Sequence, residues 1–356
     1  MSSRAEIAGH WIDPGTPMRV IAEIGLNHNG DPQLAHALID ACADAGVWAI
    51  KLQAFDAAQL LVADAPAPAH VQAASLREFF RRFELDVDVW PALVARARAR
   101  GLAVIVTAFD AHAVDTFAAL GVDAFKIASG DLTHALLVER VSRSGRPVIL
   151  STGMSTDGDV SNAVDWAVSS GARTVALLHC VSAYPTPDDQ QNLRAIATLA
   201  RHYPLPIGLS DHGMGADAAL LAFALGATLY ERHVYLPGTD AIDAPVSSTP
   251  EELADLVRRL DRAHAAMGDG RRAPQDQERP NIVPSRRGLY ARRTLAPGER
   301  IDAEDVIALR PAAGLGAEYA RALVGCEVTR DIPEGSAFEP SDLTSGRGRG
   351  DDGAAS

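Results

Sequence analysis

The chain has 356 residues, of which 47% are hydrophobic and 22% charged, and its formal net charge is −13. This length is enough for one large core and a smaller second unit. The acidic balance argues against a general affinity for nucleic acids or acidic membranes, and no apolar run approaches the length of a membrane span. The N-terminal residues lack the apolar stretch of a secretory signal, and the three cysteines have no paired spacing. We therefore expect a cytoplasmic protein.

Eight short apolar runs recur along the chain, separated by helix-like stretches. They cover residues 19–25, 48–53, 103–108, 124–129, 147–152, 174–179, 206–211 and 228–233. Residues typical of helix ends support four of the intervening helices. We predict these helices at 31–45, 111–120, 157–170 and 214–225, and each is followed by glycine. Strands that alternate with helices eight times predict a parallel (β/α)8 barrel, an α/β fold of the TIM type. The segment 54–102 is long for one unit and predicts an extra loop.

The amino-acid composition and the hydrophobic pattern change after the last predicted barrel helix. We place the barrel domain at 1–268 and a linker rich in Gly, Pro, Arg and Gln at 269–284. Residues 285–344 read as a small β-rich module, in which L-A-P-G-E-R-I and I-P-E-G-S-A-F repeat one turn pattern. The tail 345–356 has almost nothing to bury, so we expect it to be disordered.

Only two of the 33 basic residues are lysines, Lys51 and Lys126, and both lie in apolar, strand-like runs. A half-buried ammonium is costly unless it is paired with an anion. An ammonium and a planar guanidinium are not interchangeable where geometry matters. We expect both lysines to face one anionic ligand. The alternative is that they survive by chance and extend from the barrel rim to solvent.

Polar residues stand at or just after the end of each predicted strand. These residues are Glu23, Asn27, Lys51, Gln53, Thr107, Asp110, Lys126, Ser129, Asp131, Ser151, Thr152, His179, Ser182, Tyr184, Ser210, Asp211, His212, Glu231 and His233. Active sites of such barrels are built at the C-terminal ends of the strands. The pattern therefore predicts a functional site at that end.

Glu23 lies between isoleucines inside a strand-like run, where a lone carboxylate would be costly. We expect it to face the ligand or to act in catalysis; the alternative is an ion pair with an arginine at the rim. Cys180 ends another run, but no base stands beside it in the sequence, so we interpret it as a buried, inert thiol.

His212 and His233 end the seventh and eighth predicted strands, which are neighbours about 5 Å apart. Two imidazoles there suit one divalent ion such as Mn²⁺ or Fe²⁺ better than a closed zinc site. The alternative is that both are ordinary hydrogen-bonding residues. Asp211 and Glu231 would then be further ligands or would orient the histidines.

Several motifs resemble the N-acetylneuraminate (sialic acid) synthase family, which includes legionaminic and pseudaminic acid synthases. They are AEIGLNHNGD (22–31), IKLQAF (50–55), FKIASGDL (125–132), ILSTGMST (149–156), LLHCVSAYPTP (177–187), GLSDH (208–212) and YERH (230–233). Beyond the linker, SRRGLYARRTLAPGERI resembles the antifreeze-like (SAF, β-clip) domain that follows the barrel in that family. The resemblance covers nearly the whole chain.

The resemblance implies that phosphoenolpyruvate condenses with an open-chain N-acetylated hexosamine, giving a nonulosonic acid and phosphate. It implies a divalent metal on His212 and His233, for which we expect Mn²⁺, with Mg²⁺ and Co²⁺ as alternatives, and a role for Glu23 in proton transfer. Phosphoenolpyruvate would bind to Lys51, Lys126, Thr107, Ser129, Ser151, Ser210 and Tyr184, and the sugar to Gln53, Asp131, Ser182 and Asp243. It also implies a homodimer with swapped SAF domains, in which Arg287 reaches the barrel of the partner.

Three departures from the family pattern concern the sugar side. Arg232 replaces a lysine that many members have, Asp243 is followed by Ala-Pro, and Ser182 stands where some members have asparagine. The acceptor therefore stays open among N-acetylmannosamine and the legionaminic or pseudaminic precursors. Two other hypotheses are a different metal-dependent barrel aldolase or hydrolase, and a non-catalytic protein of sugar binding or coat assembly.

Overall fold

The computed structural model describes residues 4–66 and 73–344, and the predicted tail 345–356 lies outside these ranges. The chain divides into two compact units, the first ending at Gly268 and the second beginning at Asp269. Within the described ranges, no helix has both the length and the hydropathy needed to cross a bilayer.

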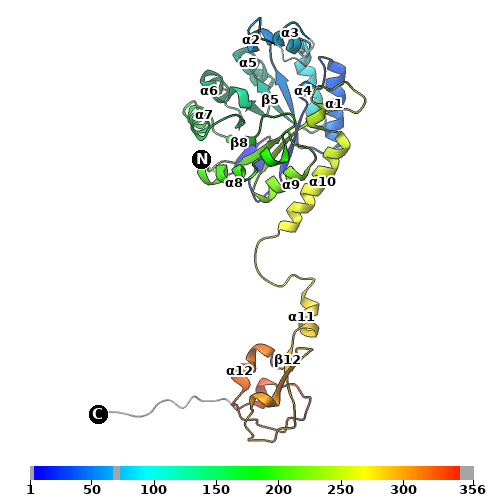
Figure 1. Ribbon diagram of the computed structural model, residues 1–356, viewed down its shortest axis with the longest axis vertical. Coiled ribbons are helices and arrows are strands. Elements are labelled where there is room, and N and C mark those ends of the chain that lie inside the picture. Colours follow the sequence, from blue (N-terminus) through cyan, green and yellow to red (C-terminus); the bar gives the residue numbers. More distant parts are fainter. Residues whose placement is uncertain (1–3, 67–72, 345–356) are drawn as a thin grey trace, which may run out of the picture. The chain divides into compact units, whose positions relative to one another are not determined.

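The first unit is a closed parallel barrel with helices outside it, as Figure 1 shows, so the predicted TIM fold is confirmed. Its strands are β3 (Arg19–Glu23), β4 (Ala49–Ala54), β5 (Ala103–Ala108), β6 (Ala124–Ile127), β7 (Val148–Ser151), β8 (Val175–Cys180), β9 (Ile207–Asp211) and β10 (Leu229–Val234). Pairing of β10 with both β9 and β3 closes the barrel. A short strand, β11 (Ser247–Ser248), adds to β10 on the side of its C-terminal end.

The helices that follow the strands cover the outside of the barrel. They are α1 (Pro32–Asp44), α4 (Trp90–Ala99), α5 (Ala111–Leu120), α6 (Ala135–Arg143), α7 (Asp157–Ser169), α8 (Arg194–His202), α9 (Asp217–Ala224) and α10 (Pro250–Met267). Side-chain caps start several of them: Asp31 accepts a hydrogen bond at the start of α1, and Thr156 and Thr249 form capping boxes on α7 and α10. The predicted helix 214–225 begins three residues late, since Gly213–Ala216 form a turn at the end of β9.

The long segment between β4 and β5 holds two short helices before α4 in its described part, which leaves out residues 67–72. These are α2 (Ala57–Leu60) and α3 (Leu76–Arg81), and a single 3-10 turn, Val87–Val89, precedes α4. Edge-to-face ring contacts connect Phe109, at the end of β5, to Phe55 and then to Phe80 of α3. The described part of the extra loop therefore packs against the C-terminal end of β5.

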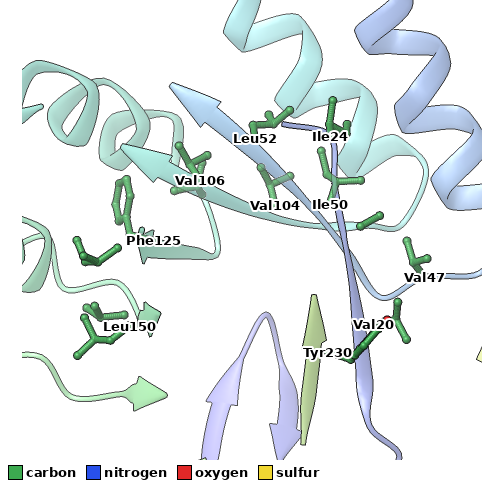
Figure 2. Packing of buried hydrophobic residues seen from close by; sticks show 14 of the residues in the cluster. Val20, Ile24, Val47, Ile50, Leu52, Val104, Val106, Phe125, Leu150 and Tyr230 are labelled. Atoms are coloured by element: carbon green, nitrogen blue, oxygen red, sulfur yellow. The ribbon is translucent and has the colours of Figure 1, made fainter. Parts of the chain in front are cut away.

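Two layers of apolar side chains form the core of the first unit. The larger layer lies between strands and helices; Figure 2 shows part of it, with Val20, Ile50, Val104, Phe125 and Tyr230 among its members. The smaller layer fills the barrel at the N-terminal ends of the strands, where the hairpin of β1 (Ala5–Ile7) and β2 (His10–Ile12) closes the bottom.

Strand alternation separates this inner apolar layer from a polar layer above it. On β10, for example, Leu229 belongs to the inner apolar cluster, and Glu231 and His233 follow on the same face at intervals of two. On β4, Ala49 is followed in the same way by Lys51 and Gln53. Inward positions near the strands' C-terminal ends therefore carry the polar groups.

The second unit contains α11 (Arg279–Ser285), β12 (Gly288–Ala291), β13 (Val306–Leu309) and α12 (Ala320–Leu323), and the region predicted as a linker includes most of α11. The repeated turn pattern in its sequence corresponds to a repeated structure. Arg293 pairs with Asp305 at 2.7 Å, and Arg330 pairs with Asp342 at 2.6 Å. Each aspartate also closes a capping box on a 3-10 turn.

Candidate active site

A cavity of about 270 Å³ opens at the C-terminal end of the barrel. Its lining includes most of the predicted site residues: Lys51, Gln53, Thr107, Lys126, Ser129, Ser151, Ser182, Tyr184, Ser210, His212 and His233. Every strand from β4 to β10 contributes to it. These residues meet at the C-terminal ends of the strands, where barrel enzymes have their active sites and where the sequence predicts a functional site.

Both lysines lie at the base of the cavity, with 3% and 5% of their surfaces exposed, so neither extends to solvent. Lys51 forms an ion pair with Glu23 and donates a hydrogen bond of 3.1 Å to Thr107 Oγ1. Lys126 Nζ lies 2.6 Å from Glu231 Oε1, and Lys51 Nζ lies 3.7 Å from the same oxygen. Glu231 thus joins the two cations, although β5 separates their strands.

The charges of this cluster stabilise one another. Burial lowers the pKa of Lys51, but Glu23 and Glu231 outweigh it, so that the pKa is raised. Burial likewise raises the pKa of Glu231, but Lys126 and Lys51 outweigh it and bring it down to about 2. Lys51 and Glu231 therefore stay ionised near neutral pH, which keeps the ammonium of Lys51 available to an anion.

Glu23 is completely buried. Its partners are Lys51 and Gln53, whose Nε2 donates a hydrogen bond of 3.1 Å to Glu23 Oε1. The alternative of a rim arginine as its partner is therefore wrong. Glu23 Oε2 has no hydrogen-bond partner in the described ranges, apart from the ion pair with the lysine.

Hydroxyl groups surround the lysines. Ser129 Oγ donates to Ser151 Oγ at 3.0 Å and accepts from the backbone nitrogen of Gly153 at 3.0 Å. Ser210 Oγ donates to Glu231 Oε1 at 3.0 Å. Two ammonium groups with several hydroxyls in one cavity fit a small ligand with more than one anionic group.

The two histidines also line the cavity, with ring centroids 5.5 Å apart. His212 Nδ1 lies 3.1 Å from the carbonyl oxygen of Val181, and His233 Nδ1 lies 3.4 Å from Asp243 Oδ2. An oxygen near each Nδ1 leaves each Nε2 available, which is the usual arrangement of metal-binding histidines. His233 Nδ1 makes no hydrogen bond within the described ranges.

These residues fit a divalent ion in an open site. No group of three His, Cys, Asp or Glu side chains in the described ranges is arranged to share an ion, so water or substrate would supply further ligands. Asp211 and Glu231, considered above as further ligands, have other partners. Asp211 bonds to Tyr230 and to the backbone of Gly213, and Glu231 bonds to the lysines.

Asp243 reaches the site from the segment after β10. Burial raises its pKa, but the nearby His233 outweighs this and lowers it, so the carboxylate is charged beside the imidazole. Gly25, in the left-handed region at φ +54°, makes the approach possible. A Cβ on this residue would lie 3.1 Å from the ring of His233 and 3.2 Å from Asp243 Oδ2.

Tyr184 and Cys180 both border His212. The ring of Tyr184 lies 4.2 Å from that of His212, at an interplanar angle of 41°. Cys180 is buried, as predicted, but it is not the isolated thiol expected from the sequence. Its Sγ lies 3.8 Å from His212 Nδ1 and faces the cavity, and although burial raises its pKa, His212 and Lys126 lower it to about 6.

Four predicted site residues are not part of the cavity lining: Glu23, Asp131, Asp243 and Arg287. Glu23 and Asp243 each contact a lining residue, Lys51 and His233. Asp131 lies half-buried in the 3-10 turn Ser129–Asp131, where burial raises the pKa of its carboxyl. Arg287 is exposed in the second unit and donates to the carbonyl oxygen of Ala308 at 3.3 Å. Conversely, Phe109 and Met154 line the cavity and were missed. Apolar side chains just after a strand give no sign in the sequence of facing a site.

Comparison with known proteins assigns the chain to a family. The model described as "NeuB family" matches residues 38–272, and that of the SAF domain matches residues 286–344. The chain belongs to the NeuB family. It is 34% identical to N,N'-diacetyllegionaminic acid synthase of Legionella pneumophila over 90% of this chain and 92% of that one, and 33% identical to the enzyme of the same name from Campylobacter jejuni over 88% and 97%.

A solved structure agrees with this assignment. The N-acetylneuraminic acid (sialic acid) synthetase of Leptospira borgpetersenii is 34% identical, with a TM-score of 0.71 over 79% of this chain and 96% of that one. The resemblance seen in the sequence motifs is confirmed, and with it the expectation of a sugar-acid synthase and of a C-terminal SAF domain.

Proposed function

We propose that the protein condenses phosphoenolpyruvate with the open-chain form of an N-acetylated amino sugar. The observation that carries this proposal is one cavity lined by both Lys51 and Lys126 and by both His212 and His233. Family members named as legionaminic and sialic acid synthases support the same reaction class.

The two lysines fit the phosphate and carboxylate of phosphoenolpyruvate. Lys51 and Lys126 would pair with these anionic groups, and Thr107, Ser129, Ser151, Ser210 and Tyr184 would bind their oxygens. Glu23 and Glu231 hold the two ammonium groups in place before the ligand arrives, which lowers the cost of organising the site.

In the reaction, C3 of phosphoenolpyruvate forms a bond with the aldehyde carbon of the sugar, and the aldehyde oxygen takes up a proton. Water then adds to the electron-poor C2, and the C–O bond to phosphate breaks, leaving a 2-keto acid and inorganic phosphate. Glu23, next to Lys51 and Gln53, would move a proton during these steps. The sugar would be held by Gln53, Ser182 and Asp243, with Asp131 near the mouth.

We propose that a divalent ion, Mn²⁺ in preference to Mg²⁺ or Co²⁺, binds His212 and His233. When bound there, it would supply Lewis acidity toward the sugar aldehyde. Val181 and Asp243 orient the two imidazoles, so the protein's own contribution is to fix their direction.

The acceptor sugar is proposed to be of the diacetamido type. Curated relatives named N,N'-diacetyllegionaminic acid synthase match the chain at 33–34% identity over most of its length. Phe109 and Met154, which also line the cavity, would suit the methyl groups of such a sugar better than hydroxyls. N-acetylmannosamine and pseudaminic precursors are the competing acceptors.

We also propose a homodimer in which the SAF domain of one chain serves the barrel of the other through Arg287. The exposed position of Arg287 leaves most of its guanidinium available for such a contact. A cytoplasmic location fits the use of phosphoenolpyruvate and the free thiols of Cys42, Cys180 and Cys326.

The test is incubation of the purified full chain with phosphoenolpyruvate, Mn²⁺ and a panel of 2-acetamido and 2,4-diacetamido sugars. Phosphate release is followed continuously, and the product is identified by mass. Phosphate release that needs both phosphoenolpyruvate and sugar is expected. No release with any sugar would refute the proposal, and sugar turnover without phosphoenolpyruvate would favour a metal-dependent aldolase or hydrolase.

A further inference from the structure

Behind the two histidines, on the outer face of β9 and β10, lies a buried polar network that does not line the cavity. It consists of Asp211, Tyr230 and Arg232, which are at most 4% exposed. Tyr230 belongs to the apolar layer under the helices, as Figure 2 shows. A guanidinium and a carboxylate in such surroundings are costly unless hydrogen bonds satisfy them, so the network needs a structural or functional reason.

The network forms hydrogen bonds with both backbone groups of Gly213, the residue that follows His212. Asp211 Oδ1 accepts a hydrogen bond of 2.7 Å from the backbone nitrogen of Gly213. Arg232 Nη1 donates to the carbonyl oxygen of Gly213 at 2.6 Å. A Cβ at this position would lie 2.4 Å from Gln191 Nε2, so the end of the Gln191 side chain would have to move. The hydrogen bonds to the nitrogen and the carbonyl oxygen of Gly213 fix the backbone directly after His212.

The same arginine also holds the strand next to His233. Its Nε donates to Ser248 Oγ at 3.2 Å, and Ser248 belongs to β11, which pairs with His233 and Val234. The neighbouring Ser247 donates a hydrogen bond of 2.6 Å to the carbonyl oxygen of Asp243, the residue whose carboxylate faces His233.

Asp211 completes the network by joining its two other members. Its Oδ2 accepts a hydrogen bond of 2.7 Å from the hydroxyl of Tyr230 and lies 3.4 Å from Arg232 Nη1. One guanidinium thus connects the backbone beside His212 to the strand beside His233. Its Nε and Nη1 donate in two directions at a fixed spacing, which a single ammonium cannot reproduce.

We propose that Arg232 is a positioning residue, which sets the separation and direction of His212 and His233 through Gly213 and Ser248. This inference rests on the proposed function, in which the two histidines bind a divalent ion. Arg232 acts through the two histidines and does not itself contact the ligand, since its side chain lies on the face of β10 opposite to them.

The experiment compares the full-length wild type with Arg232→Lys, and uses Arg140→Lys as the matched control. The side chain of Arg140 is 47% exposed and pairs with Asp115, and both residues lie on helices that follow β5 and β6, not β9 and β10. Binding of Mn²⁺ alone is measured from the electron spin resonance signal of the free ion. The Kd is expected to rise about 10-fold or more in Arg232→Lys, the usual effect of removing a contact that orients a metal ligand, and to stay unchanged in the control.

Kinetics supply a second measurement that a purely structural role would not change in this way. With Arg232→Lys, the Mn²⁺ concentration for half-maximal activity should rise with the Kd, and saturating Mn²⁺ should restore most of kcat. The KM for phosphoenolpyruvate should stay within about twofold, because the described ion pairs and hydrogen bonds of Lys51 and Lys126 go to Glu23, Glu231 and Thr107 and not to members of the network.

Tyr230→Phe tests the same network if Arg232→Lys does not fold. It removes only the hydroxyl that donates to Asp211, and a smaller increase in the Kd for Mn²⁺, above about threefold, is expected. Folded variants that bind Mn²⁺ as tightly as the wild type would overturn this inference alone. A wild type that binds no divalent ion would overturn the proposed metal role, and this inference with it.

Discussion

The ion pair between Lys126 and Glu231 allows a quantitative prediction. Both side chains are at most 6% exposed, and their charged atoms are 2.6 Å apart. Lowering the pKa of Glu231 from 4.5 to about 2 corresponds to about 3 kcal/mol of stability near neutral pH. This agrees with the ~3–5 kcal/mol that is typically lost when one partner of a buried pair is removed.

We therefore expect Glu231→Gln to lower the free energy of unfolding by about 3 kcal/mol at pH 7. Lys126→Met should cost somewhat less, because Lys51 still lies 3.7 Å from the carboxylate. The double variant should cost less than the sum of the two by about 2 kcal/mol or more, since it leaves neither charge alone. Urea unfolding of the full chain, followed by circular dichroism, measures all three values.

The pH dependence gives the same prediction a second test. Because the folded-state pKa of Glu231 is lowered, its contribution is present above about pH 4.5 and is lost as the pH falls toward 2. The difference in stability between the wild type and Glu231→Gln should therefore shrink over that range.

The exposed pair of Arg258 and Asp255, 3.1 Å apart, serves as the control, and its coupling energy should stay below about 0.5 kcal/mol. Additive effects of Glu231→Gln and Lys126→Met, within about 0.5 kcal/mol, would refute the reasoning.

Three further predictions concern the site. Lys51→Arg and Lys126→Arg should keep the fold but lose phosphoenolpyruvate turnover by about 100-fold, since the bulkier guanidinium cannot take the place of a compact, almost completely buried ammonium; near-normal kinetics in both would contradict this. Gly25→Ala should impair Mn²⁺ binding and activity because its Cβ would meet His233, whereas Gly46→Ala, at φ +76° with open space around it, should lose only stability; equal activity in the two variants would argue against the contact. Co-expression of Arg287→Ala with His212→Ala should restore part of the activity that each variant lacks alone, because a swapped dimer recovers one intact site. Absence of restoration in purified hybrid dimers would refute the swap.

Much of the barrel was predictable because its signals are local. The eight apolar runs correspond to β3–β10 within a few residues, and the predicted helix 111–120 coincides with α5. Asp31 and Gly121 mark helix ends through their own side chain or backbone conformation, so neighbours along the chain suffice to identify them. The prediction for 214–225 was less accurate, since the turn at Gly213 depends not only on the nearby Asp211 but also on Arg232 from the neighbouring strand β10.

For the candidate site, too, one part was predictable from the sequence and another part was not. The sequence by itself determined which residue types stand at the strand ends, because period-two alternation and the shared direction of parallel strands place them at one end of the barrel. Only the tertiary structure decided their partners. It paired Glu23 with Lys51, connected Glu231 to both lysines, turned Asp211 away from the cavity and brought Cys180 against His212. Such partners come from strands far apart in the sequence, and their approach depends on the closure and stagger of the whole barrel, which no local pattern records.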